Sequence, residues 1–129
     1  IPKKNSLTQV CDVLEKNNAV VFVMDQHASL PKDGIAVEFF GKKTGTYRSL
    51  ATLARYTNLP VVPAASYRKP NGQHVLKFYD PIPWEESAGG HHEEIYQNTL
   101  RYNQILEKLI LEHPEQWLWT HRRWKRIRE

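Results

Sequence analysis

One unbroken run of β-branched and aromatic residues constrains the fold of this chain more than any other feature. The run reads Ala19-Val-Val-Phe-Val-Met24 and offers no polar position that would face water. A strand with apolar residues on both faces is typical of a parallel sheet that is covered by helices. We therefore predict a central buried strand at residues 20–24.

Helical and strand-like patterns alternate along the rest of the chain. Helices are expected from the capping box of Ser6 and Gln9 up to Asn17, at about residues 46–57 and at about residues 93–112. Strands are expected at residues 35–40, 60–67 and 75–79, and a Pro-Asn-Gly turn at residues 69–72 joins the last two as an antiparallel pair. This order predicts an α/β fold with a mixed, mainly parallel sheet flanked by helices.

Size and composition restrict the class of protein. The 129 residues are enough for one hydrophobic core, so we expect a single domain, 1–129. The net charge of +4 is mild, whereas a dedicated nucleic-acid binder is usually more basic, so no nucleic-acid partner is expected. The one cysteine, Cys11, rules out an internal disulfide and any multi-cysteine zinc site.

Other features bear on cofactors and on the membrane. His91-His92-Glu93-Glu94 looks like a set of metal ligands. Neighbouring side chains diverge on a helix, however, and acidic residues in a first turn are explained by the helix dipole, so we expect neither a metal nor a cofactor. No apolar run reaches the ~20 residues that span a bilayer. The chain starts at Ile1 without methionine, which we interpret as a piece of a longer polypeptide.

The C-terminal stretch is rich in tryptophan and arginine. It reads His113-Pro-Glu-Gln-Trp-Leu-Trp-Thr-His-Arg-Arg-Trp-Lys125. Because proline suits the first turn of a helix, we expect a helix here, with one face formed by Trp117, His121, Trp124 and Arg128. Two compatible interpretations follow. The tryptophans dock this helix on the core, or the rings and basic residues meet anionic membrane headgroups.

Polar residues follow the ends of two predicted strands. These are Asp25-Gln26-His27 and Ser66-Tyr67-Arg68, and ligands gather at the carboxyl ends of parallel strands. Between them, Gly41-Lys-Lys-Thr-Gly-Thr46 leads into an expected helix and predicts an anion site; the alternative is an exposed loop with a capping threonine. Asp25 would orient His27 or a substrate hydroxyl, or it would cap its own loop.

Several motifs follow one another in an order that a bacterial enzyme family shares. They are Val-Phe-Val-Met-Asp25-Gln26-His27, Val-Glu-Phe-Phe40-Gly41, Thr44-Gly45-Thr46, Leu53-Ala54-Arg55, Leu59-Pro-Val-Val-Pro63 with Arg68, and the C-terminal stretch. Over about residues 20–125 the chain resembles the bacterial lipid A biosynthesis acyltransferases, the late lauroyl and myristoyl transferases. This resemblance implies the C-terminal part of a glycerolipid-acyltransferase-like fold.

The resemblance also implies a mechanism. The family uses a histidine and an acidic residue, spaced His-x4-Asp/Glu, to deprotonate a substrate hydroxyl for attack on an acyl thioester. This chain contains no such spacing. The nearest pairs are His27 with Asp33 and His74 with Asp80, and neither aligns with the family's pair. We therefore expect no catalytic residue in this chain, and no activity from it alone.

Partners and binding residues are implied by the same resemblance. The donor would be an acyl-carrier protein thioester and the acceptor a phosphorylated lipid A precursor, at the membrane surface on the cytoplasmic face of the bacterial inner membrane. The implied substrate-binding residues are Asp25, Gln26, Thr44, Thr46, Arg68, Arg122 and Arg123. The arginines would pair with sugar phosphates, since a guanidinium binds phosphate through two parallel hydrogen bonds.

Other functions compete with the enzyme. One is a non-catalytic module that binds anionic lipid or the acyl carrier. Another is a nucleic-acid binder that uses the basic aromatic stretch, whose affinity would fall steeply with salt. The sequence encoded upstream of Ile1 separates the module from the enzyme: a His-x4-Asp/Glu motif would support the enzyme, and a start codon at Ile1 would support the module.

Overall fold

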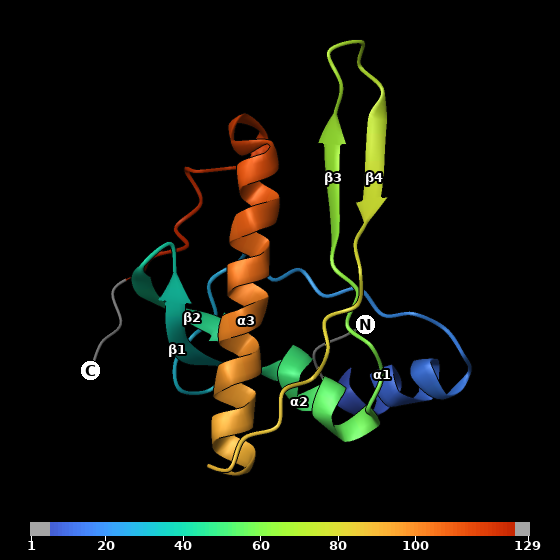
Figure 1. The fold of residues 1–129 in the computed structure, drawn as a ribbon, viewed down its shortest axis with the longest axis vertical. Helices are drawn as coiled ribbons and strands as arrows, with labels where there is room; N and C mark the ends of the chain where they lie inside the picture. The colour runs from blue at the N-terminus through green and yellow to red at the C-terminus, as the bar shows by residue number, and fades with distance from the viewer. Residues whose placement is uncertain (1–5, 126–129) are drawn as a thin grey trace.

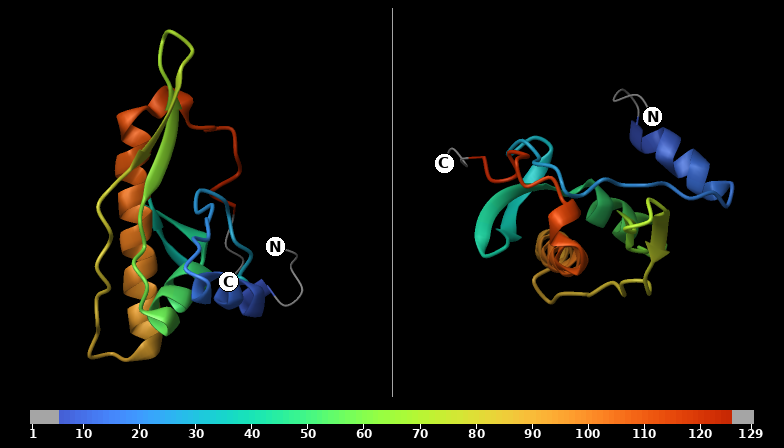
Figure 2. Two further views of the ribbon diagram at one scale, coloured as in Figure 1. Left: turned by 90° about the vertical axis from the view of Figure 1, so that its right-hand side faces the viewer. Right: turned by 90° about the horizontal axis from the view of Figure 1, so that it is seen from above.

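The computed structural model describes residues 6–125, arranged around one long helix (Figure 1). The elements are α1 (Ser6–Glu15), β1 (Gly34–Phe39), β2 (Lys42–Tyr47), α2 (Ser49–Thr57), β3 (Ala64–Arg68), β4 (His74–Phe78), α3 (His91–Glu112) and the short 3-10 helix η1 (Pro114–Gln116). The β1–β2 hairpin lies on one side of α3 and the β3–β4 hairpin lies on the other (Figures 1 and 2).

The strands confirm the α/β class but not the mainly parallel sheet. Within residues 6–125 each sheet has two antiparallel strands, β1 with β2 and β3 with β4. The predicted central strand at residues 20–24 is wrong for this structure, because the segment belongs to neither sheet. Val21 is 87% exposed and Val23 is 63% exposed, while the alternate residues are half-buried. The run is apolar on both faces, but the described residues cover only one of them.

The β1–β2 hairpin replaces the basic loop that the sequence predicted. Phe39 pairs with Lys42, so the turn contains only Phe40 and Gly41. Both have positive φ, 49° and 69°, as a type I′ hairpin turn requires. Lys42–Tyr47 is therefore a strand, α2 begins at Ser49 rather than near Thr46, and the anion site predicted at a helix N-terminus is wrong.

The β3–β4 hairpin and α3 agree with the sequence predictions. The turn closes with hydrogen bonds from Gly72 N to Lys69 O (2.9 Å) and from Lys69 N to Gln73 O (2.9 Å), and Gly72 has a φ of 85°. Below the strands, an isolated bridge joins Val61 to Ile82. The helix α3 matches the helix expected at about residues 93–112, and its buried residues include Ile95, Thr99, Tyr102 and Ile110.

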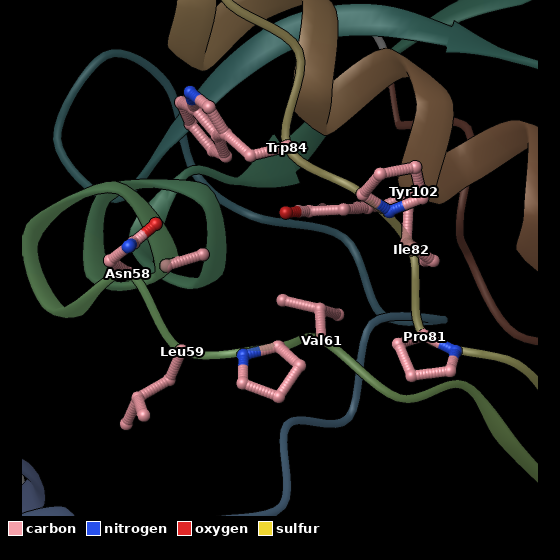
Figure 3. A pocket seen from close by; sticks show the side chains of 10 residues that line it. Asn58, Leu59, Val61, Pro81, Ile82, Trp84 and Tyr102 are labelled. Carbon is pink, nitrogen blue, oxygen red and sulfur yellow. The ribbon is translucent and has the colours of Figure 1, made fainter.

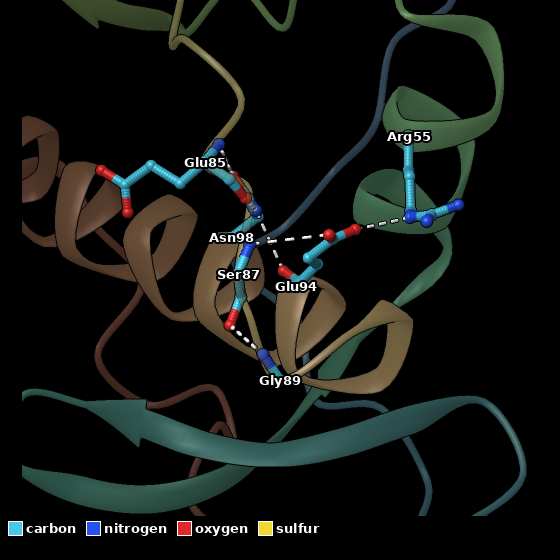
Figure 4. Close-up of polar contacts among 6 residues, drawn as sticks. All are labelled: Arg55, Glu85, Ser87, Gly89, Glu94 and Asn98. Carbon is cyan, nitrogen blue, oxygen red and sulfur yellow. Dashed lines mark hydrogen bonds and ion pairs between the residues drawn. The ribbon is translucent and has the colours of Figure 1, made fainter.

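The hydrophobic core lies between α2, α3 and the Val61–Ile82 bridge. Its buried residues are Ala51, Ile82, Ile95 and Tyr102, and half-buried apolar residues pack around them. Polar contacts hold the two helices and the loop before α3 together (Figure 4). Arg55 pairs with Glu94 at 2.6 Å, and the buried Asn98 side chain bonds to the backbone of Glu85 through both its oxygen (3.1 Å) and its nitrogen (2.8 Å).

The C-terminal stretch does not form the expected helix. After the three residues of η1 the backbone becomes extended at Trp117, and the chain runs without helix to Lys125. The tryptophans nevertheless dock as predicted: the rings of Trp117 and Trp124 lie 5.9 Å and 5.6 Å from that of the buried Phe39. Arg128, expected on the same helix face, lies outside the described residues.

Candidate functional site

The structure divides the predicted binding residues among a buried cluster, a groove and the exposed surface. Thr44, Thr46 and Arg123 form one buried polar cluster, and Asp25 lies close enough to act on the charge of Arg123. Arg68 lies apart from them, in a groove at the end of β3. Gln26 and Arg122 are exposed, and no hydrogen bond ties either side chain to another part of the described chain.

Arg123 is the centre of the buried cluster. It is fully buried, and its guanidinium donates to Gly45 O at 2.7 Å, to Thr46 Oγ1 at 2.8 Å and to Thr44 Oγ1 at 3.2 Å. The carbonyl oxygen of Arg123 accepts a hydrogen bond from Thr44 Oγ1 at 2.5 Å. Its guanidinium carbon also lies 4.8 Å from the centre of the Phe39 ring, within the range of a cation–π contact. Arg123 therefore fastens the C-terminal stretch to β2.

The two threonines of the cluster are turned inward. Both are fully buried, and Thr46 Oγ1 accepts a further hydrogen bond from Asn103 Nδ2 at 3.0 Å. Asn103 Nδ2 also donates to Glu38 O at 2.8 Å, which links α3 to β1. The threonine hydroxyls thus have partners inside the protein, and their binding role in a longer enzyme stays a prediction.

Burial shapes the electrostatics of this cluster. Desolvation lowers the pKa of Arg123 to about 10, and the nearby Asp25 carboxylate opposes that shift. The guanidinium therefore stays charged at neutral pH. Within residues 6–125, four buried side-chain atoms lack a hydrogen-bond partner: Asp25 Oδ1, Asn103 Oδ1, His121 Nε2 and Arg123 Nε. Asp25 Oδ1 accepts no hydrogen bond from its own loop, and the Asp25 charge acts on Arg123, which favours an electrostatic role over a loop cap.

His27 contacts the same cluster and makes it sensitive to pH. Its Nδ1 lies 3.3 Å from Arg123 O and 3.4 Å from Thr44 Oγ1. Burial lowers the pKa of His27 below its ordinary value of 6.5, although the hydrogen bond to the Arg123 carbonyl opposes this. The unfolded chain therefore binds a proton here more readily than the folded chain does. Its contribution to stability is complete above pH 6.5, declines as the pH falls below 6.5, and changes no further below the folded pKa.

We therefore expect acid to destabilise the natural chain more than a His27→Gln variant. Urea unfolding at about pH 7.5 and about pH 5.5 measures this, because the difference between the two proteins isolates His27 from the other histidines. An identical loss of stability on acidification in both proteins would contradict the assignment.

Arg68 lies in a groove of about 810 Å³ between the β3–β4 turn and η1. Its lining residues are Ser66, Tyr67, Arg68, Lys69, Pro70, His74, His113, Glu115 and Gln116. Gln116 holds the backbone of Arg68 from both sides, with 2.7 Å from Arg68 N to Gln116 Oε1 and 2.9 Å from Gln116 Nε2 to Arg68 O. The rings of Tyr67 and His113 stack with their centres 4.0 Å apart.

Neither His113 nor Gln116 was singled out from the sequence, although both belong to the conspicuous C-terminal stretch. Their partners lie far away along the chain, so no local pattern reports the contact. The stretch itself was the available signal, and its place beside β3 emerges only from the fold.

Another hollow, of about 290 Å³, lies beside the core (Figure 3). It is lined mainly by apolar side chains, among them Leu59, Val61, Ile82 and Trp84. Burial raises the pKa of Tyr102, which also lines it, to about 12. That phenol therefore stays protonated at neutral pH and is not a base, so the hollow offers packing rather than proton transfer.

The described residues also bear on catalysis, metals and the membrane. His113 Nδ1 lies 3.8 Å from Glu115 Oε1, which is longer than the hydrogen bond of a base and its orienting acid. In the part of the chain that the structure describes, no three side chains of His, Cys, Asp or Glu gather as metal ligands. No helix among these residues combines the length and the apolar character needed to cross a membrane.

The described residues thus form an α/β fold with a buried cluster around Arg123, whose hydrogen-bond partners are internal, and a separate groove that contains Arg68. Residues 1–126 match the family described as "Bacterial lipid A biosynthesis acyltransferase". The chain belongs to this family, which confirms the resemblance inferred from its motifs.

Two relatives from Escherichia coli (strain K12) illustrate the relationship. The chain is 28% identical over 122 residues to "Lipid A biosynthesis palmitoleoyltransferase", covering 95% of this chain and 38% of that protein. It is 29% identical over 111 residues to "Lipid A biosynthesis lauroyltransferase", covering 85% of this chain and 35% of that protein. The chain thus spans less than two-fifths of the length of these relatives.

Proposed function

We propose that this chain forms part of an acyltransferase that moves a fatty acyl chain onto a lipid A precursor in lipopolysaccharide biosynthesis. The observation that carries the proposal is the family match over residues 1–126, together with relatives named as palmitoleoyl- and lauroyltransferases. The proposed donor is an acyl-carrier protein thioester, and the proposed acceptor is a phosphorylated precursor. The glycerolipid-acyltransferase-like fold is likewise a proposal for the longer protein.

In this proposal some of the predicted binding residues contact the substrate, and the others shape the wall of the cleft. Gln26, Arg68 and Arg122 are exposed, which leaves their side chains open to a substrate. Asp25, Thr44, Thr46 and Arg123 surround the loop at His27, where their internal contacts favour a role in shaping the wall of the cleft. A phosphate contact through Arg68 or Arg122 would use the planar fork of the guanidinium.

The proposed location is the cytoplasmic face of the bacterial inner membrane, with contact to the membrane surface. Leu118 is 67% exposed and Trp119 is 47% exposed, and the exposed Arg122 follows shortly after them. An aromatic ring beside a cation suits the headgroup region of a bilayer. Trp117 and Trp124 contribute less to such a surface, since their rings pack around Phe39.

Acyl transfer in vitro tests the proposed function. We expect the full-length product of the gene to acylate a lipid A precursor from an acyl-carrier protein thioester, and we expect the 129-residue chain alone to show no turnover. Without the family's histidine–acid pair, the chain could supply only binding and orientation. Transfer by the chain alone that disappears on His27→Ala would overturn the view that catalysis lies outside it.

A further inference from the structure

The groove at the end of β3 carries the charge pattern of an anion site. Arg68 and Lys69 contribute permanent cations, and His74 lies directly opposite Arg68 in the hairpin register. The ring of His113, the residue that follows α3, adds a further nitrogen donor. Glu115 is the carboxylate that lines the groove.

A second acidic residue at the end of α3 is already neutralised. Glu112 Oε2 accepts hydrogen bonds from Tyr79 at 2.7 Å and from Lys77 at 3.0 Å, and Lys77 forms an ion pair with it. These contacts lie on the face of β4 that is opposite to His74, because side chains alternate along a strand. Glu112 therefore repels an anion in the groove only weakly.

In the described part of the chain, the backbone of Arg68 is fixed by hydrogen bonds, whereas its guanidinium is free to bind a ligand. Its backbone N–H and carbonyl are both bonded to the side-chain amide of Gln116, so the amide pairs with the end of β3 as a neighbouring strand would. In contrast, the guanidinium of Arg68 makes no hydrogen bond or ion pair to any residue in 6–125. The backbone is fixed while the charged fork stays free, which reduces the ordering cost of a bidentate contact.

We propose that this groove binds a phosphate group of the acceptor, with Arg68 as the contact residue and Gln116 as the positioning residue that holds its backbone. The inference deepens the proposed function and rests on it, because it takes the acceptor to be a phosphorylated lipid. Lys69, His74 and His113 supply additional donors around the guanidinium. The ligand class is a phosphate monoester or diphosphate carried by a lipid headgroup.

Direct binding tests the groove without catalysis. The 129-residue chain is titrated with inorganic pyrophosphate, and separately with phosphatidylcholine vesicles that contain phosphatidic acid. We expect both probes to bind, and we expect Arg68→Gln to weaken both by roughly 10- to 100-fold, the range of a charge-assisted hydrogen bond. Gln116→Ala should weaken them several-fold, and should have no further effect once Arg68 is replaced, because the two residues act as one unit.

Matched variants outside the groove serve as controls. Arg48→Gln removes an exposed arginine and Gln104→Ala removes an exposed glutamine, so neither should change the affinity for either probe. Urea unfolding of every variant verifies that the fold is retained. No binding of either probe, an equal loss with Arg48→Gln, or binding of pyrophosphate without the vesicles would each overturn the proposal.

Catalysis by the full-length enzyme separates this inference from the proposed function. Arg68→Gln should lower kcat/KM for the phosphorylated acceptor and leave that for the dephosphorylated acceptor nearly unchanged. An equal loss for both acceptors would refute the phosphate assignment while the acyltransferase function stands. If the natural enzyme transfers no acyl chain, the proposed function fails, and the binding titrations still decide whether the groove is an anion site.

Discussion

Arg123→Ala is expected to lower the free energy of unfolding by about 3–5 kcal/mol, the range found when one member of a buried charged network is removed. The side chain is fully buried and donates to Gly45 O, Thr44 Oγ1 and Thr46 Oγ1. Its loss leaves the Gly45 carbonyl without its guanidinium partner, in a site from which water is excluded. It also removes the cation that stacks on Phe39 and leaves a cavity.

Urea denaturation of the 129-residue chain measures this effect, with Arg122→Ala as the matched control. Arg122 is the exposed neighbour in the same stretch, so its replacement should change the stability by less than about 0.5 kcal/mol. Arg123→Lys keeps the charge but not the fork that reaches three acceptors, and should lie between the two. Equal stabilities of the Arg122→Ala and Arg123→Ala variants would contradict the conclusion that Arg123 anchors the C-terminal stretch to β2.

The adjacent arginines of the C-terminal stretch thus differ in what they do. From the sequence alone, Arg122 and Arg123 are both expected to bind phosphates, because both are basic residues among tryptophans. In the structure Arg122 is exposed, whereas Arg123 bonds to β2 and its neighbour Trp124 donates from Nε1 to Phe39 O at 3.0 Å. The stretch therefore joins β1 and β2 to the end of α3, and it brings His113 and Gln116 beside β3.

The elements that could be predicted from the sequence are those with a local cause. The 3.6-residue period of apolar residues defines α3, and the turn at residues 69–72 contains the Pro and Asn-Gly residues that such turns require. Both signals lie within a few residues of the structure that they specify. The antiparallel pairing of β3 with β4 follows directly from that turn.

The wrong predictions concern contacts that depend on distant residues. An apolar run at residues 20–24 indicates burial on both faces, but it does not identify the residues that provide it, and Val21 and Val23 remain exposed here. The β1–β2 turn places Phe40 at a φ of 49°, a conformation that phenylalanine rarely adopts. Its N–H donates to Glu107 Oε1 of α3 at 2.7 Å, a contact that no pattern around Phe40 reports.

In the candidate site, too, the residues could be predicted from the sequence, whereas their contacts with distant residues could not. The motif order, rather than any spacing, selected Asp25, Thr44, Thr46 and Arg123, and the structure brings these four residues together. That the threonines and Arg123 would bond to each other rather than face a substrate depends on how the C-terminal stretch folds back. The link between Gln116 and Arg68 likewise joins a side-chain amide to a backbone that is remote in sequence.

Gly45→Ala is expected to destabilise the chain by about 3 kcal/mol or more, which exceeds the usual cost of overpacking because backbone is the obstacle. A Cβ atom at Gly45 would overlap the carbonyl oxygen of Ala28 and would lie 3.1 Å from His27 Cε1. Ala28 is itself fully buried, and its N–H donates to Gly45 O at 3.0 Å, so the two segments cannot separate without losing that bond. The need for glycine here comes from close approach, since Gly45 has no positive φ.

Gly72→Ala is the matched control, because both variants change glycine to alanine and restrict the unfolded chain equally. Gly72 has a φ of 85° with nothing within 4 Å of a Cβ, so only the strain of the left-handed conformation, about 1 kcal/mol, is expected there. Urea midpoints of the natural chain and of both variants give the comparison. Gly45→Ala should also shift the resonances of His27 and Asp25, since the loop that holds them must move away from β2. If Gly45→Ala costs no more than Gly72→Ala, the loop does not pack against β2 as described, and Asp25 loses its place beside Arg123.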